Sequence, residues 1–219
     1  MNNLFGSNPK LKIYPREKEL KTKWEGKNET VTVNESQFSL LKSENEEKEF
    51  KKKQFSNPED LKKYNHYREE WYRRAKEFDH GNAPLAVTIE LVSTCNLGCT
   101  MCYTITEEFQ SSVVGSTRML PWPVVKNIID ECCEIGVYSI LFSWRGESSL
   151  YRYKNEDGSI TTFTDVLSYA VKKGILEVTS LTHGQNFSDE FCENLVKAQP
   201  NWISFSIDGL GEDYNKIRT

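Results

Sequence analysis

The sequence predicts an α/β fold in which a parallel sheet forms over residues 84–219, behind a charged N-terminal extension. Three observations support this fold class. From Pro84 onward, short apolar runs alternate with longer helical patterns, which is typical of β/α units. The short runs are almost continuously apolar, as expected for strands that are buried on both faces. Polar residues and glycines follow the runs, at the strand ends where parallel folds bind ligands.

The N-terminal part of the chain differs from the rest in composition. Residues 1–80 carry 18 Lys and Arg against 15 Asp and Glu, whereas residues 81–219 carry 10 against 17. Within residues 1–56, the run KSENEEKEFKKKQ mixes both signs and holds few apolar residues, so we expect a charged, partly disordered arm. The acidic residues interleave with the basic ones, and this pattern argues against nucleic-acid binding.

Residues 57–83 are predicted to form a lead-in helix. Pro58 stands in the first turn and Glu59 and Asp60 complement the positive end of the helix dipole. The run LKKYNHYREEWYRRAKEF then places its aromatic residues broadly on one face, which indicates a packing face. The polar residues 79–82 end the helix.

The first β/α unit is predicted to begin with a strand over residues 85–92, which leads into Ser93 to Cys102. Residues 121–135 have a helical pattern. A second strand over residues 137–143 is followed by the polar residues 144–147.

The next unit carries an insertion. We expect YRYKNEDGSITT, residues 151–162, to form a small hairpin whose turn lies at residues 155–158. A helix over residues 162–173 follows and ends at a glycine, the usual C-terminal stop. The third strand, residues 175–180, leads to Thr182-His183-Gly184.

The last predicted elements complete the alternation. Residues 188–198 form a helix with Ser188 as its N-cap. The fourth strand covers residues 202–207 and leads into Asp208-Gly209, and a further helix begins near Glu212. The sequence thus predicts four strand ends, each followed by polar residues, at one rim of the sheet.

We expect a cytoplasmic protein that makes no membrane contact. The chain has no run of about 18 apolar residues and no apolar stretch near its start that is long enough for a secretory signal. Six cysteines in a reducing compartment are unsuited to a disulfide framework. Cys132, Cys133 and Cys192 are interpreted as core residues, because a free cysteine behaves as a small hydrophobe.

Three of the cysteines are close in sequence. Cys95, Cys99 and Cys102 have the spacing C-x3-C-x2-C, and soft thiolates select zinc, copper(I) or iron–sulfur clusters. Structural zinc requires a fourth ligand, and the next cysteine is Cys132, inside a predicted helix. Three thiolates on a [4Fe–4S] cluster would leave one iron open to a small molecule. A zinc-binding interaction module remains an alternative at this point.

The motifs resemble those of the radical S-adenosylmethionine (SAM) superfamily over roughly residues 64–219. The resemblance rests on PLAVTIELVSTCNLGCTMCY, SILFSWRGESSL, the strand ending in THG, and WISFSIDGLGEDYNKIR, in that order. It implies a partial (β/α) barrel of which about four of six parallel strands are present here. We therefore expect a core domain over residues 84–219 that is incomplete at its C-terminus, from a fragment, a truncated product or one half of a split protein.

The resemblance implies a role for each residue of the cysteine motif. Cys95, Cys99 and Cys102 would ligate the [4Fe–4S] cluster as its metal ligands. Met101 would lie near the adenine of SAM, in a position where the family usually has an aromatic residue. Tyr103 would pack beside the cluster.

The other strand ends are assigned by the same resemblance. Gly146 and Glu147 would hold the SAM amino group, and a carboxylate suits an ammonium-type donor. Ser206 would contact the ribose hydroxyls, with Asp208 in the turn beyond it, and Arg218 would lie near SAM.

Two further positions depart from the family. Thr182 and His183 are expected at the rim, where asparagine is more usual than histidine. Ser148-Ser149-Leu150 replace the family's proline and apolar pair.

The implied function is reductive cleavage of SAM to a 5′-deoxyadenosyl radical, which removes hydrogen from a substrate. A flavodoxin- or ferredoxin-type donor would supply the electron, and the lead-in segment resembles enzymes of sugar or surface-polysaccharide metabolism. The resemblance does not identify a catalytic residue. The alternatives are a non-catalytic remnant that binds the cluster or SAM, one half of a split enzyme that requires a complementing C-terminal chain, and the zinc module.

Overall fold

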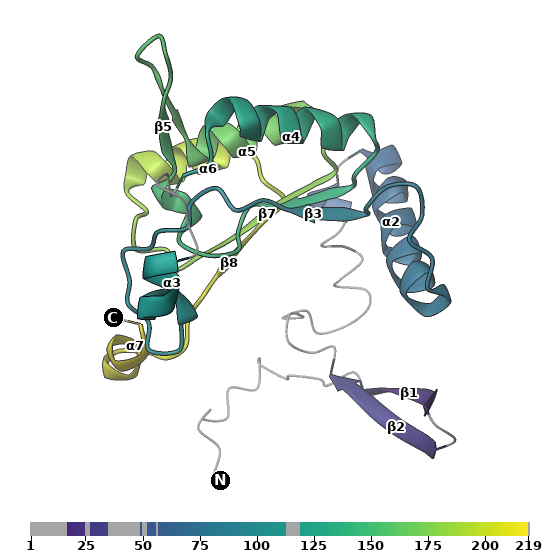
Figure 1. Ribbon diagram of the computed structural model, residues 1–219. Helices are drawn as coiled ribbons and strands as arrows, with labels where there is room; N and C mark the ends of the chain where they lie inside the picture. Colours follow the sequence, from purple (N-terminus) through teal and green to yellow (C-terminus); the bar gives the residue numbers. More distant parts are fainter. Residues whose placement is uncertain are drawn as a thin grey trace. The chain divides into compact units, whose positions relative to one another are not determined.

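A computed structural model describes residues 17–24, 27–34, 49, 52–55, 57–112 and 119–218 (Figure 1). The chain divides into two compact units, Met1–Leu61 and Lys62–Thr219, which are described separately. This division falls inside the predicted lead-in helix. None of the helices in the described ranges is both long and apolar enough to cross a membrane.

The N-terminal unit contains a hairpin that the sequence analysis did not predict. β1 (Glu17–Trp24) pairs antiparallel with β2 (Lys27–Asn34), with Glu17 opposite Asn34 and Trp24 opposite Lys27. The segment KNETVTVN alternates β-branched and polar residues, a period-two signal that the high charge of the arm obscured. Apart from residues 49 and 52–55, the rest of the arm lies outside the described residues, so its partial disorder stays a prediction.

The second unit is built on a parallel sheet with the strand order β3-β4-β7-β8. Its strands are β3 (Ala86–Thr88), β4 (Ser139–Leu141), β7 (Glu177–Thr182) and β8 (Trp202–Phe205). Val87 lies opposite Ile140, which lies opposite Val178, and every pairing in this sheet is parallel. The predicted α/β class with four parallel strands is confirmed.

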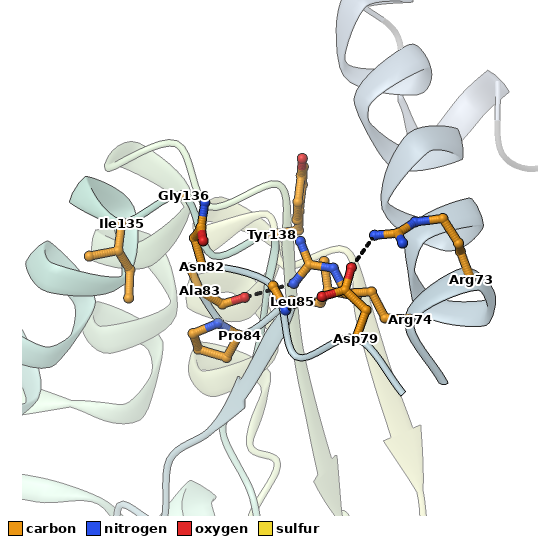
Figure 2. Close-up of a pocket in the computed structure, with 11 residues that line it drawn as sticks. Arg73, Arg74, Asp79, Asn82, Ala83, Pro84, Leu85, Ile135, Gly136 and Tyr138 are labelled. Carbon is orange, nitrogen blue, oxygen red and sulfur yellow. Dashed lines mark hydrogen bonds and ion pairs between the residues drawn. The ribbon is translucent and has the colours of Figure 1, made fainter. Parts of the chain in front are cut away.

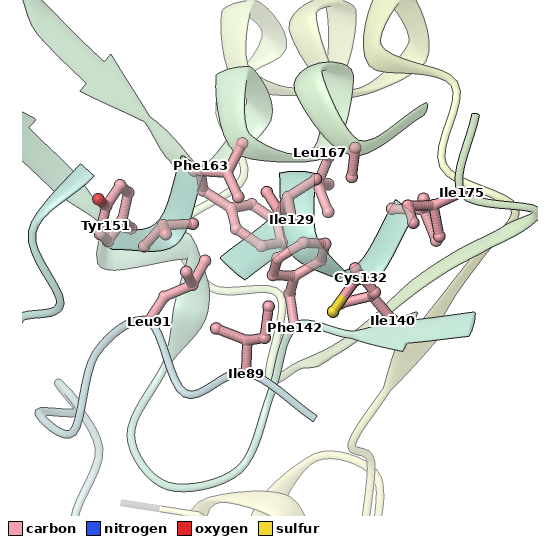
Figure 3. Packing of buried hydrophobic residues seen from close by; sticks show 14 of the residues in the cluster. Ile89, Leu91, Ile129, Cys132, Ile140, Phe142, Tyr151, Phe163, Leu167 and Ile175 are labelled. Atoms are coloured by element: carbon pink, nitrogen blue, oxygen red, sulfur yellow. The ribbon is translucent and has the colours of Figure 1, made fainter. Parts of the chain in front are cut away.

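Helices connect consecutive strands and cover one face of the sheet. They are α4 (Trp122–Glu134), α5 (Phe163–Lys172) and α6 (Asp189–Ala198), which lie together on one side of the strands in Figure 1. Their apolar faces meet Ile140, Phe142 and Val178 in a core from which water is excluded (Figure 3). Burial of this apolar surface is the main force that holds the helices on the sheet.

The helix starts are encoded locally. Thr162 and Asp165 form a capping box at the start of α5, and the Thr162 amide donates to the Asp165 carboxylate at 2.8 Å. At α6 the predicted N-cap is confirmed, since the Ser188 hydroxyl accepts from the Phe191 amide at 3.2 Å. The last helix, α7, covers Glu212–Ile217.

The first strand is shorter than the predicted residues 85–92. The Ile89 amide still donates to the Leu141 carbonyl at 2.9 Å, but the chain then leaves β4. Beyond this point the Leu91 carbonyl accepts from Leu120, and Val92 forms an isolated antiparallel bridge with Met119. The apolar run continues because these residues remain in the core, not because the parallel pairing continues.

The insertion after the second strand is the predicted hairpin. β5 (Arg152–Lys154) pairs antiparallel with β6 (Ile160–Thr162), and the Asn155 amide donates to Ser159 across the turn. The hairpin projects beyond the helix layer in Figure 1. Tyr151, at its base, is fully buried and donates its hydroxyl to the Leu120 carbonyl at 3.0 Å. Short helices that the sequence did not indicate also occur: η2 (Tyr103–Ile105), α3 (Glu107–Ser112) and η3 (Ser148–Leu150).

The predicted lead-in helix is α2 (Pro58–Glu77). In its Lys62–Glu77 part, which belongs to the second unit, the buried Tyr67 stacks on Tyr138 with ring centroids 5.5 Å apart. The Arg74 guanidinium donates to the Ala83 carbonyl at 2.8 Å, just before β3. These contacts attach the helix to the N-terminal ends of β3 and β4.

Candidate functional site

The predicted site residues lie at the C-terminal edge of the parallel sheet. The cysteine loop follows β3, Arg145 to Glu147 follow β4, Thr182 and His183 end β7, and Ser206 to Asp208 follow β8. Neighbouring parallel strands end at the same edge, so loops that are distant in sequence meet there.

The cysteine loop is a compact turn. The Cys102 amide donates to the Cys99 carbonyl at 2.9 Å, which folds the end of the motif back on itself. Cys99 is buried, Cys102 is half-buried and Cys95 is exposed. The Cys95 sulfur accepts from the Leu97 amide at 3.4 Å, and the Cys102 sulfur lies 2.9 Å from the Thr104 hydroxyl.

The thiols affect one another electrostatically. Although Cys95 as a whole residue is exposed, the protein around its thiol partly desolvates it, which raises the pKa of the Cys95 thiol above its usual value, while the Leu97 amide lowers it. The nearby Glu147 carboxylate, Cys99 and Cys102 raise this pKa further. The positive charge of a bound metal would instead lower the pKa of the thiol, because the metal binds the thiolate form.

The donor chemistry of the loop fits an iron–sulfur cluster. Within the described ranges, no three Cys, His, Asp or Glu side chains are gathered around a point that could hold a metal ion. The three soft thiol donors of one loop nevertheless match the ligand type that such a cluster takes from a protein. Cys132 lies in α4 and Cys192 in α6, so neither belongs to this loop. Cys132 is buried as predicted, whereas Cys133 and Cys192 are exposed, so their interpretation as core residues was wrong.

Glu147 is buried rather than presented to solvent. Its side chain is 4% exposed, and it accepts from the Ser149 amide at 3.1 Å, the Thr182 hydroxyl at 2.7 Å and the His183 amide at 3.1 Å. A carboxylate has about four acceptor positions. The protein therefore fills most of them, and the contact between Glu147 and an amino group stays a prediction.

Gly146 allows the loops after β3 and β4 to touch. Its φ is +67°, and a Cβ at this position would lie 2.4 Å from the Val92 carbonyl oxygen and 2.6 Å from that of Thr94. The next amide, Glu147, donates to the Thr94 carbonyl at 2.9 Å. Only glycine combines this backbone angle with so close an approach.

His183 lies inside the site rather than on its rim. The Nδ1 atom of His183 accepts from the Gln185 amide at 3.0 Å, so the network assigns the ring proton to Nε2. Nε2 then donates to Asn96 Oδ1 at 3.0 Å and lies 3.4 Å from the Glu147 carboxylate. Burial lowers the pKa of His183, although Glu147 opposes this effect. The imidazole therefore joins the cysteine loop to the Glu147 loop in its neutral form.

Sequence reasoning missed the amides around this histidine. The Asn96 and Asn186 side chains bond each other at 3.2 and 3.3 Å, and Asn186 also donates to the Ser149 hydroxyl at 3.0 Å. Asn96 directly follows the first cysteine of the motif, and this adjacency was the available signal. Asn186 offered none, because its partners are distant in sequence.

The segment after β8 returns to the cysteine loop. The Thr100 amide donates to the Ile217 carbonyl at 3.0 Å. Arg218 pairs with Asp208 and directs Nη1 toward the Cys99 sulfur at 3.9 Å. The Ser206 amide donates to the Thr182 carbonyl at 2.8 Å, which places Ser206 beside the β7 end of the site.

The remaining site candidates lie on the surface of the rim. Met101 and Tyr103 are exposed, and the Tyr103 ring meets the Phe109 ring edge-on with centroids 5.6 Å apart. Arg145 pairs with Glu90 at 2.6 Å and lies over the Phe109 ring, so it braces its loop, whereas Trp144 is 72% exposed.

A cavity of about 550 Å³ lies at the opposite end of the strands (Figure 2). It is lined in part by Arg73, Arg74, Asp79 and Tyr138. Arg73 pairs with Asp79 at 2.7 Å and Arg74 donates to the Ala83 carbonyl. These contacts stabilise the connection between α2 and β3. The thiols follow the other ends of the same strands, and the cavity is therefore separate from the cysteine site.

The sequence matches a known family model, and part of the chain is similar to solved structures. The sequence model of the family described as "Radical SAM superfamily" matches residues 89–219. The solved structure of BtrN in complex with AdoMet and 2-DOIA is similar at 14% identity and a TM-score of 0.44, over 61% of this chain and 50% of that chain. Native anSMEcpe with bound AdoMet is similar at 19% identity and a TM-score of 0.46, over 62% of this chain and 36% of that chain. The chain thus spans half or less of the length of either structure. No curated protein sequence matches it.

Proposed function

The chain belongs to the radical SAM superfamily, and we propose that it binds a [4Fe–4S] cluster through Cys95, Cys99 and Cys102 and uses SAM beside that cluster to start radical chemistry. Membership of this superfamily implies binding of SAM and of an iron–sulfur cluster. The observation that carries the residue assignment is the cysteine loop at the C-terminal sheet edge, next to Gly146 and Glu147.

The bound cluster and SAM would supply the chemistry, namely one-electron cleavage of SAM to a 5′-deoxyadenosyl radical that removes hydrogen from a substrate. The three thiolates would hold the cluster and leave one iron for SAM. Burial of Cys99 and the turn between Cys99 and Cys102 support a loop that keeps its shape while the cluster is bound.

The SAM site would lie between the strand ends. The fixed backbone at Gly146 and the position of the Glu147 carboxylate at the same strand end support a contact with the SAM amino group. Ser206 and Asp208 would lie near the ribose, and Met101 and Tyr103 would provide exposed apolar surface near the cluster. We include Arg218 in this set because it lies beside Cys99.

The reaction would require a low-potential electron donor, for which a flavodoxin or ferredoxin type is suited. The exposed Cys95 and the exposed side chains of Met101 and Tyr103 support access to the cluster from this rim.

Anaerobic reconstitution with iron and sulfide tests the proposal. We expect about four irons and four sulfides per chain, and 5′-deoxyadenosine after dithionite and SAM are added. Cys99→Ala should lose both the cluster and the product. Cys192→Ala is the matched control, because Cys192 is an exposed thiol on α6 and should leave both unchanged.

The outcomes separate the alternatives. A cluster without 5′-deoxyadenosine would indicate a cluster-binding protein that lacks this activity by itself. A colourless protein that binds one zinc per chain through the same cysteines would refute the proposal and support the zinc module.

A further inference from the structure

We propose that Arg218 is a positioning residue that raises the reduction potential of the cluster through the sulfur of Cys99. This inference rests on the proposed function, because it concerns the cluster that the three cysteines would hold. It assigns to Arg218 a role toward the ligand sulfur itself, which is separate from a contact with SAM.

The geometry at Cys99 supports the assignment. Arg218 Nη1 lies 3.9 Å from the Cys99 sulfur, and the two residues are 119 positions apart in the sequence. The Arg218 side chain is 15% exposed and Cys99 is buried. Solvent therefore screens this charge less than it screens a surface arginine.

Among the contacts of the described residues given above, each ligand sulfur meets one donor, and one of these three donors is charged. Cys95 is met by the Leu97 amide and Cys102 by the Thr104 hydroxyl, which must donate when the sulfur is an iron-bound thiolate. Cys99 is met by a guanidinium. Among these three contacts, the one at Cys99 should have the largest electrostatic effect on the cluster.

The guanidinium is held in this place from two sides. Asp208 pairs with Arg218 Nε and leaves Nη1 directed at the sulfur. The preceding residue, Ile217, accepts from the Thr100 amide at 3.0 Å, so the backbone before Arg218 is attached to the cysteine loop. The side chain is therefore positioned by contacts that do not involve SAM.

The direction of the effect follows from charge. Reduction adds one electron to the cluster, and a nearby positive charge stabilises the reduced form more than the oxidised form. Hydrogen bonds and charges at the ligand sulfurs are known means by which proteins tune such potentials. Removal of the Arg218 charge should make the midpoint potential more negative.

The test is an anaerobic potential titration, monitored by the electron paramagnetic resonance of the reduced cluster and performed without SAM. Arg218→Gln should take up the same iron and sulfide as the unmodified chain and show a more negative midpoint potential. Arg218→Lys retains the charge but loses the planar fork, so its midpoint should lie between the two. Lys216→Gln is the matched control, since Lys216 carries the same charge two residues away from Arg218. Its ammonium group pairs with the carboxylate of the exposed Asp213.

Each outcome decides the matter. A shift in Arg218→Gln that exceeds the shift in Lys216→Gln supports the proposal. Equal midpoints in the unmodified chain and Arg218→Gln overturn it. If Arg218→Gln does not take up iron, Arg218→Met, which is also uncharged, decides, and an unchanged midpoint in that variant overturns the proposal. Failure of the unmodified chain to form any cluster would instead reject the proposed function and this inference with it.

Discussion

The Thr182 hydroxyl donates to Glu147 at 2.7 Å, and both residues are buried although they lie 35 positions apart. Thr182 ends β7 and Glu147 follows β4, which are adjacent strands in the parallel sheet. The bond therefore joins two strand ends at the C-terminal edge of the sheet, where we propose that SAM binds.

Thr182→Val should lower the free energy of unfolding by about 1–3 kcal/mol, because it removes a donor from a buried carboxylate without a large change in shape. Urea unfolding of the cluster-free chain measures this loss. Thr179→Val is the matched control on the same strand, where the hydroxyl meets only a neutral carbonyl at 3.4 Å. An equal effect in both variants would contradict a special role for the Glu147 contact.

Gly146→Ala should prevent the loops after β3 and β4 from meeting. The added Cβ would lie 2.4 Å from a backbone oxygen, and backbone cannot move aside as a flexible side chain can. Gly158→Ala controls for backbone angle alone, because Gly158 has φ +85° but nothing within 4 Å of its Cβ position.

We expect Gly158→Ala to destabilise the chain by about 1 kcal/mol and Gly146→Ala by several times more. Thermal unfolding of the two variants provides the comparison. Similar losses would show that the close approach at Gly146 does not matter.

Stability should fall on mild acidification because of His183. Burial lowers its pKa in the folded chain below the ordinary value of 6.5. Above about pH 6.5 the imidazole is neutral in both states and contributes no pH dependence. As the pH falls below this value, the unfolded chain binds a proton that the folded chain does not, so the free energy of unfolding decreases by up to about 1.4 kcal/mol per pH unit.

Urea unfolding at pH 7.5 and pH 5.5 measures this dependence. His183→Gln removes the titrating group and should flatten the profile between these values. Carboxylates that bond to cations titrate below this pH range and should not contribute to the profile. Asp130 is an example, because Lys173, Tyr169 and Lys126 lower its pKa. A profile that is identical in the variant would rule out His183 as its source.

Tyr151→Phe should reduce stability by about 1 kcal/mol, since the Leu120 carbonyl loses a donor while the buried ring still fills its space. Differential scanning calorimetry measures the change. Tyr72→Phe serves as a control on an exposed tyrosine of α2 and should change stability less. A neutral result for Tyr151→Phe would indicate that the carbonyl finds another donor.

The order and type of the main elements could be predicted from the sequence. The helices α4, α5 and α6 and all four parallel strands occur where the periodicity placed them, with ends that differ by a few residues. Helix starts at Ser188 and Thr162 depend on neighbours within three residues, so the local sequence encodes them.

Other elements were missed because their signals are weak or depend on distant partners. The β1–β2 hairpin was obscured by charge, and α3 spans only Glu107–Ser112. The early end of β3 depends on Leu91 and Val92 pairing with the segment around Met119 and Leu120, which a periodicity pattern does not contain.

The sequence alone determined the fold class and the set of three thiol donors in the cysteine motif, because periodicity and the spacing of Cys95, Cys99 and Cys102 are local properties. Only the tertiary structure decided that the Glu147 carboxylate is buried, that His183 joins two loops, and that Arg218 meets Cys99 across 119 residues. The physical reason is that a parallel sheet gathers the ends of all its strands at one edge. Which side chains then bond one another depends on strand register and burial, and no single segment carries that information.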